Sequence, residues 1–108
     1  MRKISFVGKS LDDLKQFPVD TKREAGYQLD RLQRGYDPND WKVIKNMGFG
    51  VREIRIKDVT GIYRVIYVVK YVETIFVLHA FKKKTQKITK SDLDIIRQRL
   101  KTITQEMP

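Results

Sequence analysis

The sequence predicts an α+β domain, in which a small twisted antiparallel sheet carries an N-terminal helical hairpin on one face and a C-terminal helix. Three observations predict this class. Residues 10–35 repeat apolar side chains at helical spacing, residues 51–81 contain three strand-like runs joined by short turns, and residues 91–103 return to helical spacing. A length of 108 residues suits one compact core, so we expect a single domain over residues 1–108.

The N-terminal third is expected to form one strand and the helical hairpin. Residues 3–7 alternate as a short strand does. The serine at the start of residues 10–17 can cap a first short helix. A second helix is expected from Asp20 as its N-cap to Gly35 as its stop. Its apolar stripe is formed by Ala25, Leu29 and Leu32.

Strand patterns fill the middle of the chain. Residues 51–57 alternate, residues 62–71 form the longest run and are expected at the centre of the sheet, and residues 74–81 follow a short turn. Residues 41–45 can add a short extended segment. Because the turns between the three runs are short, neighbouring strands must pair antiparallel.

The C-terminal quarter begins with a polar and strongly basic crossover at residues 82–90. Ser91 and Asp94 have the spacing of a capping pair for a last helix. This helix is expected to present one apolar face to the sheet, formed by Leu93, Ile96, Leu100 and Ile103.

The charge of the chain is strongly positive. Lysine and arginine number 23 against 13 aspartates and glutamates, a formal net charge of +10. Such an excess in a small domain points to a polyanionic partner, because each phosphate contact releases condensed counterions. That partner can be a nucleic acid, an acidic protein segment or both; the simpler alternative is that the charge only keeps the protein soluble.

Several classes of protein are disfavoured by what the sequence lacks. It has no cysteine, which favours a reducing compartment, and a single histidine, which argues against a zinc site. No P-loop motif is present, and we expect neither a metal nor another cofactor. The N-terminus has no signal-peptide pattern, and the longest apolar stretch, residues 65–69, cannot span a membrane. We therefore expect a cytoplasmic protein without a membrane partner.

Charged side chains occupy one face of the predicted sheet. Glu53, Arg55 and Lys57 alternate with the apolar Ile54 and Ile56, so they point away from the side that the helices need. Arg64 interrupts the most apolar strand, where a charge is costly unless it is paired or opens to a cleft. Two interpretations stay open for Arg64, an ion pair with Glu53 or another acid, and a functional role among the neighbouring positive charges.

The segment after residue 78 contains the remaining candidates. His79 is the only histidine, and a lone strand histidine is more often a hydrogen-bonded structural residue than a catalyst. Four lysines in six residues follow, as a solvated loop or as a phosphate clamp: Lys82, Lys83, Lys84 and Lys87.

One metal-free chemistry suits these residue types. RNA cleaves itself when a 2′-OH attacks the adjacent phosphate, and a protein assists by aligning the atoms, moving two protons and neutralising the crowded phosphate. Arginine and lysine can neutralise that charge. Glu53, His79 or a lysine could move the protons.

Six segments together resemble the phage-derived, HigB-like branch of the RelE/ParE toxin superfamily. The most specific is LHAFKKKTQK at residues 78–87, which looks like the LH-x-F-x-KKTQK signature of that branch. The others are FP at 17–18, AGYQLDRLQRG at 25–35, DWK at 40–42, GVREIRI at 50–56 and YRVIY at 63–67. The match covers nearly the whole chain.

The resemblance implies the toxin of a type II toxin–antitoxin system, with a RelE/ParE-like fold and a cognate antitoxin, usually of the helix-turn-helix type. It implies a metal-independent endoribonuclease (an mRNA interferase) that cleaves mRNA on the ribosome. We expect a catalytic group of Arg55, Arg64, His79, Lys83 and Lys84, and RNA-binding side chains at Arg52, Lys57, Phe81, Lys82 and Lys87.

Two other functions fit the same residues. A ParE-like toxin of this fold would bind and inhibit DNA gyrase, which is a binding function without catalysis. A phage-derived accessory module would bind nucleic acid without toxicity. The nuclease is favoured because a gyrase inhibitor needs no convergent cluster of arginine and lysine on one sheet face.

Overall fold

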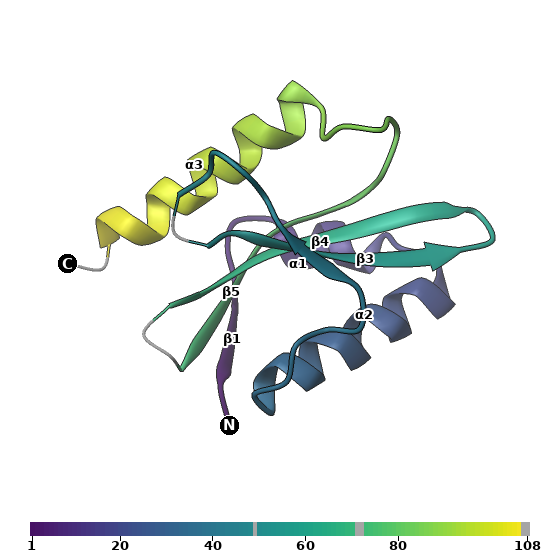
Figure 1. Ribbon diagram of the computed structural model, residues 1–108, viewed down its shortest axis with the longest axis horizontal. Helices are drawn as coiled ribbons and strands as arrows, with labels where there is room; N and C mark the ends of the chain where they lie inside the picture. Colours follow the sequence, from purple (N-terminus) through teal and green to yellow (C-terminus); the bar gives the residue numbers. More distant parts are fainter. Residues whose placement is uncertain (49, 71–72, 107–108) are drawn as a thin grey trace.

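The computed structural model describes residues 1–48, 50–70 and 73–106 and confirms the α+β class. One five-stranded sheet lies between two layers of helix, with α2 on one side and α3 on the other (Figure 1). The elements in chain order are β1 (Lys3–Phe6), α1 (Ser10–Lys15), α2 (Val19–Gln33), β2 (Trp41–Val43), β3 (Arg52–Asp58), β4 (Gly61–Lys70), β5 (Thr74–Lys82) and α3 (Lys90–Glu106).

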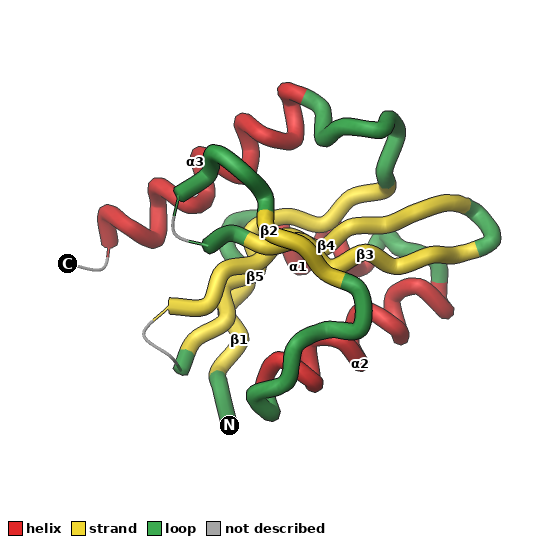
Figure 2. Tube along the Cα trace, in the orientation of Figure 1, coloured by secondary structure: helices red, strands yellow, loops and turns green. Residues whose placement is uncertain are grey.

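The sheet is mixed rather than wholly antiparallel. Its order is β1-β5-β4-β3-β2, so the short β2, labelled in Figure 2, is an edge strand of the sheet. β2, β3, β4 and β5 pair antiparallel, as their short connections require, whereas β1 pairs parallel with β5. No short turn joins β1 to β5, because all the other strands and two helices separate them in the chain, so turn geometry does not fix their direction.

The helical hairpin covers one face of the sheet with an apolar core. Ala25, Leu29 and Leu32 of α2 are buried there together with side chains of α1 and its C-terminal end. The strands contribute a continuous apolar set from β3 to β5. Its buried members are Ile54, Ile56, Tyr63, Val65, Tyr67, Ile75, Val77 and Ala80.

The opposite face is partly covered by α3. Ile96, Leu100 and Ile103 of α3 form a second core with side chains of β4 and β5, among them Ile66 and Leu78. Only the part of this face that α3 leaves uncovered is therefore open to polar side chains. An amphipathic helix has to bury its apolar stripe, and this end of the face offers apolar partners.

The start of α3 differs from the sequence-based expectation. The Thr89 hydroxyl accepts a hydrogen bond from the Asp92 N–H at 3.2 Å and donates one to Asp92 Oδ2 at 2.8 Å. Thr89 and Asp92 thus cap the helix, two residues before the expected pair of Ser91 and Asp94. Both pairs have the same spacing, so spacing alone does not choose between them.

A β-bulge changes which side chains of β5 face α3. Ile66 pairs with His79 and Tyr67 pairs with Val77, which leaves Leu78 as the extra residue. Both Leu78 and His79 consequently lie on the α3 side, although simple alternation would separate them. The bulge also brings Phe81 to that side, where its ring stacks on His79 with centroids 4.8 Å apart.

No helix within the described residues is both long and apolar enough to cross a lipid bilayer.

Candidate nucleic-acid interface

A row of candidate residues crosses three strands on the α3 face. Arg55 of β3 lies directly opposite Arg64 of β4, and Arg64 lies opposite Phe81 of β5. In the next row Lys57 faces Ile62, whose carbonyl accepts a hydrogen bond from the Lys83 N–H at 2.7 Å. Five of the sequence-predicted residues therefore share one end of this face, beyond the N-terminus of α3.

Arg64 forms the ion pair that was one of its two interpretations. Its Nη1 lies 3.1 Å from Glu53 Oε2, and the exposed fractions of the two side chains are 3% and 0%. Lys42 of β2 approaches the other carboxylate oxygen at 3.4 Å and is half exposed. A buried cation with a carboxylate beside it avoids the large cost of an unpaired charge. Arg64 is thus the buried cation of the row, and Lys42 is the exposed cation that contacts the same carboxylate.

Arg55 lies at the edge of the sheet. Its Nε and Nη2 donate hydrogen bonds to Asp40 Oδ1 at 3.2 and 2.9 Å, and its side chain is 38% exposed. The backbone N–H of Arg55 also donates to the Asp40 carbonyl at 2.9 Å. The guanidinium is therefore held in place at the surface with part of its surface free.

The basic loop, which we define as residues 83–89, connects β5 to α3. Lys84 and Lys87 are exposed, and Lys83 is half buried. Lys83 and Lys84 line a surface groove of about 460 Å³ with Ile62, Thr85 and Gln86. The described residues that line this groove include no carboxylate, so its two lysines can meet an anion without competition.

Two expected RNA-binding residues lie on the other face of the sheet. The Arg52 guanidinium sits 4.3 Å from the centre of the Trp41 ring and 3.5 Å from Asp37. Lys82 lies over the ring of Tyr63 at 6.0 Å, on the hairpin side. Arg52 and Lys82 therefore do not share a surface with Arg55 and Lys83, which corrects the expected grouping. Alternation could have shown this, because Arg52 is three positions from Arg55 and Lys82 is one position from Lys83, and an odd separation in a strand means opposite faces.

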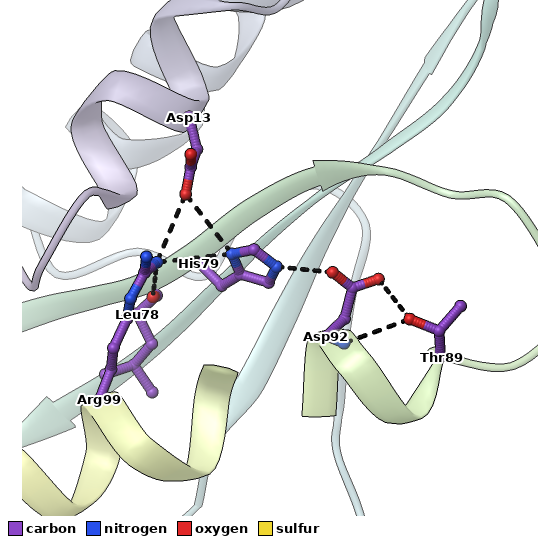
Figure 3. Close-up of polar contacts among 6 residues, drawn as sticks. All are labelled: Asp13, Leu78, His79, Thr89, Asp92 and Arg99. Atoms are coloured by element: carbon purple, nitrogen blue, oxygen red, sulfur yellow. Dashed lines mark hydrogen bonds and ion pairs between the residues drawn. The ribbon is translucent and has the colours of Figure 1, made fainter. Parts of the chain in front are cut away.

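His79 lies in a buried polar cluster rather than at an open surface. Its Nε2 is 2.8 Å from Asp92 Oδ1, and its Nδ1 is 3.7 Å from Asp13 Oδ2 and 3.5 Å from Arg99 Nη1 (Figure 3). The side chain is only 7% exposed. A catalytic position for His79 was expected, but both ring nitrogens face protein groups and neither faces a groove.

Sequence reasoning missed several residues of these sites. Asp92 could have been found, because Thr89 and Asp92 have the spacing of a capping pair. Lys42 could have been found from the alternation of the extended segment around it. Asp13 and Arg99 reach His79 only through the packing of α1 and α3, which no local pattern reveals.

Within the described residues, no group of three or more histidine, cysteine, aspartate or glutamate side chains is placed to hold a metal ion. The candidate residues are exposed or half-buried arginines and lysines, together with Arg64 and His79, which are buried beside carboxylates. Such a surface can bind phosphates and neutralise developing charge.

Comparisons with known proteins agree with this architecture. The chain superposes on a double arginine-to-alanine mutant of the E. coli toxin RelE in the free state, with a TM-score of 0.63 and 13% identity over 94% of this chain and 97% of that one. At that identity the likeness concerns the fold. No curated protein matches the sequence significantly. The family model of phage-derived Gp49-like proteins matches residues 12–101, and the chain therefore belongs to that family.

Proposed function

We propose that this chain is the toxin of a type II toxin–antitoxin system and acts as a ribosome-dependent mRNA endoribonuclease. An antitoxin, of the helix-turn-helix type, would hold it inactive. The observation that carries the proposal is the basic end of the α3 face, defined as Lys42, Arg55, Lys57, Lys83 and Lys84. The likeness in fold to a protein named as a toxin supports the same conclusion.

The basic end suits an RNA backbone better than a folded protein surface. Lys83 and Lys84 line an acid-free groove after β5, and Arg55 and Lys57 lie on the same face of β3, with β4 between. Lysine and arginine side chains commonly contact phosphate oxygens. Phe81, half buried beside them, offers an aromatic edge near the groove.

The proposed cleavage balances without a metal or another cofactor. The 2′-OH loses its proton and attacks the adjacent phosphorus, the bond to the 5′ oxygen breaks, and that oxygen takes up a proton. Lys83 and Lys84 would neutralise the phosphate as charge builds up. Glu53 and His79 are buried against their own partners, so lysines of the basic end are the proposed proton carriers. One, as a neutral amine, would accept the proton of the 2′-OH, and another, as an ammonium, would give a proton to the 5′ oxygen.

The test is inducible expression of the chain, with and without its antitoxin, followed by mapping of mRNA ends. We expect rapid growth arrest with cleaved mRNA, and loss of both effects in Lys83→Ala/Lys84→Ala. The matched control is Lys3→Ala/Lys15→Ala, which removes the same charge from exposed sites on other elements and should stay toxic. Intact mRNA with damaged DNA would favour gyrase inhibition, and no growth defect would favour an accessory module; either result overturns the proposal.

A further inference from the structure

The polar cluster around His79 joins three elements that are distant in the sequence. It consists of Asp13 from α1, His79 from β5, and Asp92 and Arg99 from α3 (Figure 3). Arg99 Nη1 donates a hydrogen bond to the Leu78 carbonyl at 2.8 Å and lies 3.4 Å from Asp13 Oδ2. The cluster therefore ties α3 to the sheet and to α1 at the same place.

The neighbours of the ring determine which nitrogen carries a proton. A carboxylate only accepts, so the 2.8 Å contact with Asp92 requires a proton on Nε2. Arg99 only donates, so in the neutral ring Nδ1 is the acceptor that it faces. Asp13 Oδ2 lies 3.7 Å from the same nitrogen and would be the acceptor if Nδ1 carried a proton. The bond from Nε2 to Asp92 persists in both states.

The cluster continues into the basic loop through Asp92. Asp92 Oδ1 meets His79, while Oδ2 accepts the hydrogen bond of the Thr89 hydroxyl. Thr89 is the last residue of the loop. At the other end of the loop, the Lys83 N–H is bound to Ile62 of β4. The loop is thus fixed to the sheet at both ends, and the second fixed point depends on His79.

We infer that His79 is a positioning residue that acts through Asp92 and Thr89 to hold the basic loop in the position where it lines the groove. The inference rests on the proposed function only for the RNA that the loop would meet. The placement itself concerns the protein alone. It assigns His79 a function that its burial permits, since the ring need not touch a substrate.

The first test uses the wild-type protein. Because the chain has one histidine, the imidazole nitrogen signals in an NMR spectrum belong to His79 without further assignment. We expect the proton on Nε2 at neutral pH, with a scalar or shift signature of its bond to Asp92. A proton on Nδ1 alone would overturn the inference.

The second test measures the loop directly with trypsin, which cleaves after Lys84 and Lys87. In His79→Leu the ring is replaced by an apolar side chain without hydrogen bonds, and cleavage in the loop should rise about tenfold or more, the factor that one charge-assisted hydrogen bond contributes. His79→Gln can still donate to Asp92 and should restore slow cleavage. Asp92→Ala should behave like His79→Leu, and Asp94→Ala, an exposed aspartate of the same helix, should not.

The site of cleavage separates positioning from a general loss of stability. Faster cleavage in the loop, with unchanged cleavage at Lys22 of α2 and Lys57 of β3, supports the inference. Equal increases at all these sites, or no increase in the loop, contradict it. RNA affinity adds the link to function: if wild-type protein binds no RNA the proposed function fails, and if it binds RNA but His79→Leu binds equally well the link from His79 to the loop fails.

Discussion

The two faces of the sheet are built from the same strands but differ in how far helices cover them. The hairpin covers its face from β3 to β5, and nearly every inward side chain there is apolar. On the other face α3 begins only at Lys90, and the rows beyond it carry Arg55, Arg64 and Lys57. Charge thus gathers where the helix layer ends, which indicates that the length and start of α3 define the surface left for a ligand.

The two faces also differ in the polar groups that they bury. The hairpin core encloses the hydroxyl of Tyr67, for which no hydrogen bond is found among the described residues. The α3 face encloses opposite charges, with Arg64 Nη1 3.1 Å from Glu53 Oε2, although Arg64 Nε and both Glu53 oxygens have no hydrogen bond among the described residues. Losing a partner should therefore have very different consequences on the two faces.

The largest expected effect follows from removing the buried carboxylate. Glu53→Ala leaves the Arg64 guanidinium without its anion in a site that is 3% exposed, so we expect a loss of about 4 kcal/mol of unfolding free energy. Urea denaturation followed by the fluorescence of Trp41 measures it.

A double variant tests whether the loss comes from the uncompensated charge. Glu53→Leu/Arg64→Met replaces the whole pair by apolar side chains and should recover most of the stability. If the double variant is as unstable as Glu53→Ala, the cost arises from packing, and the contrast between the two faces is smaller than we argue.

The second prediction concerns the edge of the charged face. Asp40→Ala removes the partner of Arg55, and because both side chains are over a third exposed, we expect a loss of only about 0.5 kcal/mol. The affinity for single-stranded RNA should rise, with a steeper salt dependence, because one more cation is free for phosphate. Binding titrations at several salt concentrations measure this.

Asp30→Ala is the matched control for Asp40→Ala. Asp30 pairs with Arg34 at 2.9 Å on an exposed surface of α2, the same distance as in the pair at the sheet edge. A similar small loss of stability without a change in RNA affinity is expected. Equal gains in affinity for both variants would mean that net charge, and not the basic end, governs binding.

Periodicity predicted the parts of the fold that depend on local contacts. The stripes of α2 and α3 and the three main strands follow from spacing alone, and Arg55 and Lys57 lie on the face that alternation predicts. The parallel pairing of β1 and the bulge at Leu78 depend on partners distant in the chain, so spacing could not reveal them. Because of the bulge, His79 faces Asp92 of α3 and Asp13 of α1.

The candidate site was also predictable only in part from the sequence. The ion pair of Arg64 was foreseen as one alternative, but its burial depends on the cross-strand register that places Glu53 diagonally beside it. The polar cluster of His79 draws residues from α1 and α3, which are more than seventy positions apart in the chain. Only packing brings such residues together.

The smallest effect is expected at Tyr67, in the closed hairpin core. Burial raises the pKa of its phenol, and the nearby Arg52 opposes that rise only in part. A raised pKa means that the folded state disfavours the phenolate, so this stability is complete below the unfolded pKa of about 10 and is lost as pH rises through the folded value.

Tyr67→Phe removes a hydroxyl without a hydrogen bond, so near pH 7 it should change stability by less than about 1 kcal/mol. At about pH 11, where unfolded tyrosine ionises, the variant should be the more stable protein in parallel urea titrations. If instead wild type and variant lose stability equally between these pH values, Tyr67 is open to solvent, and the hairpin face is less closed than its apolar core implies.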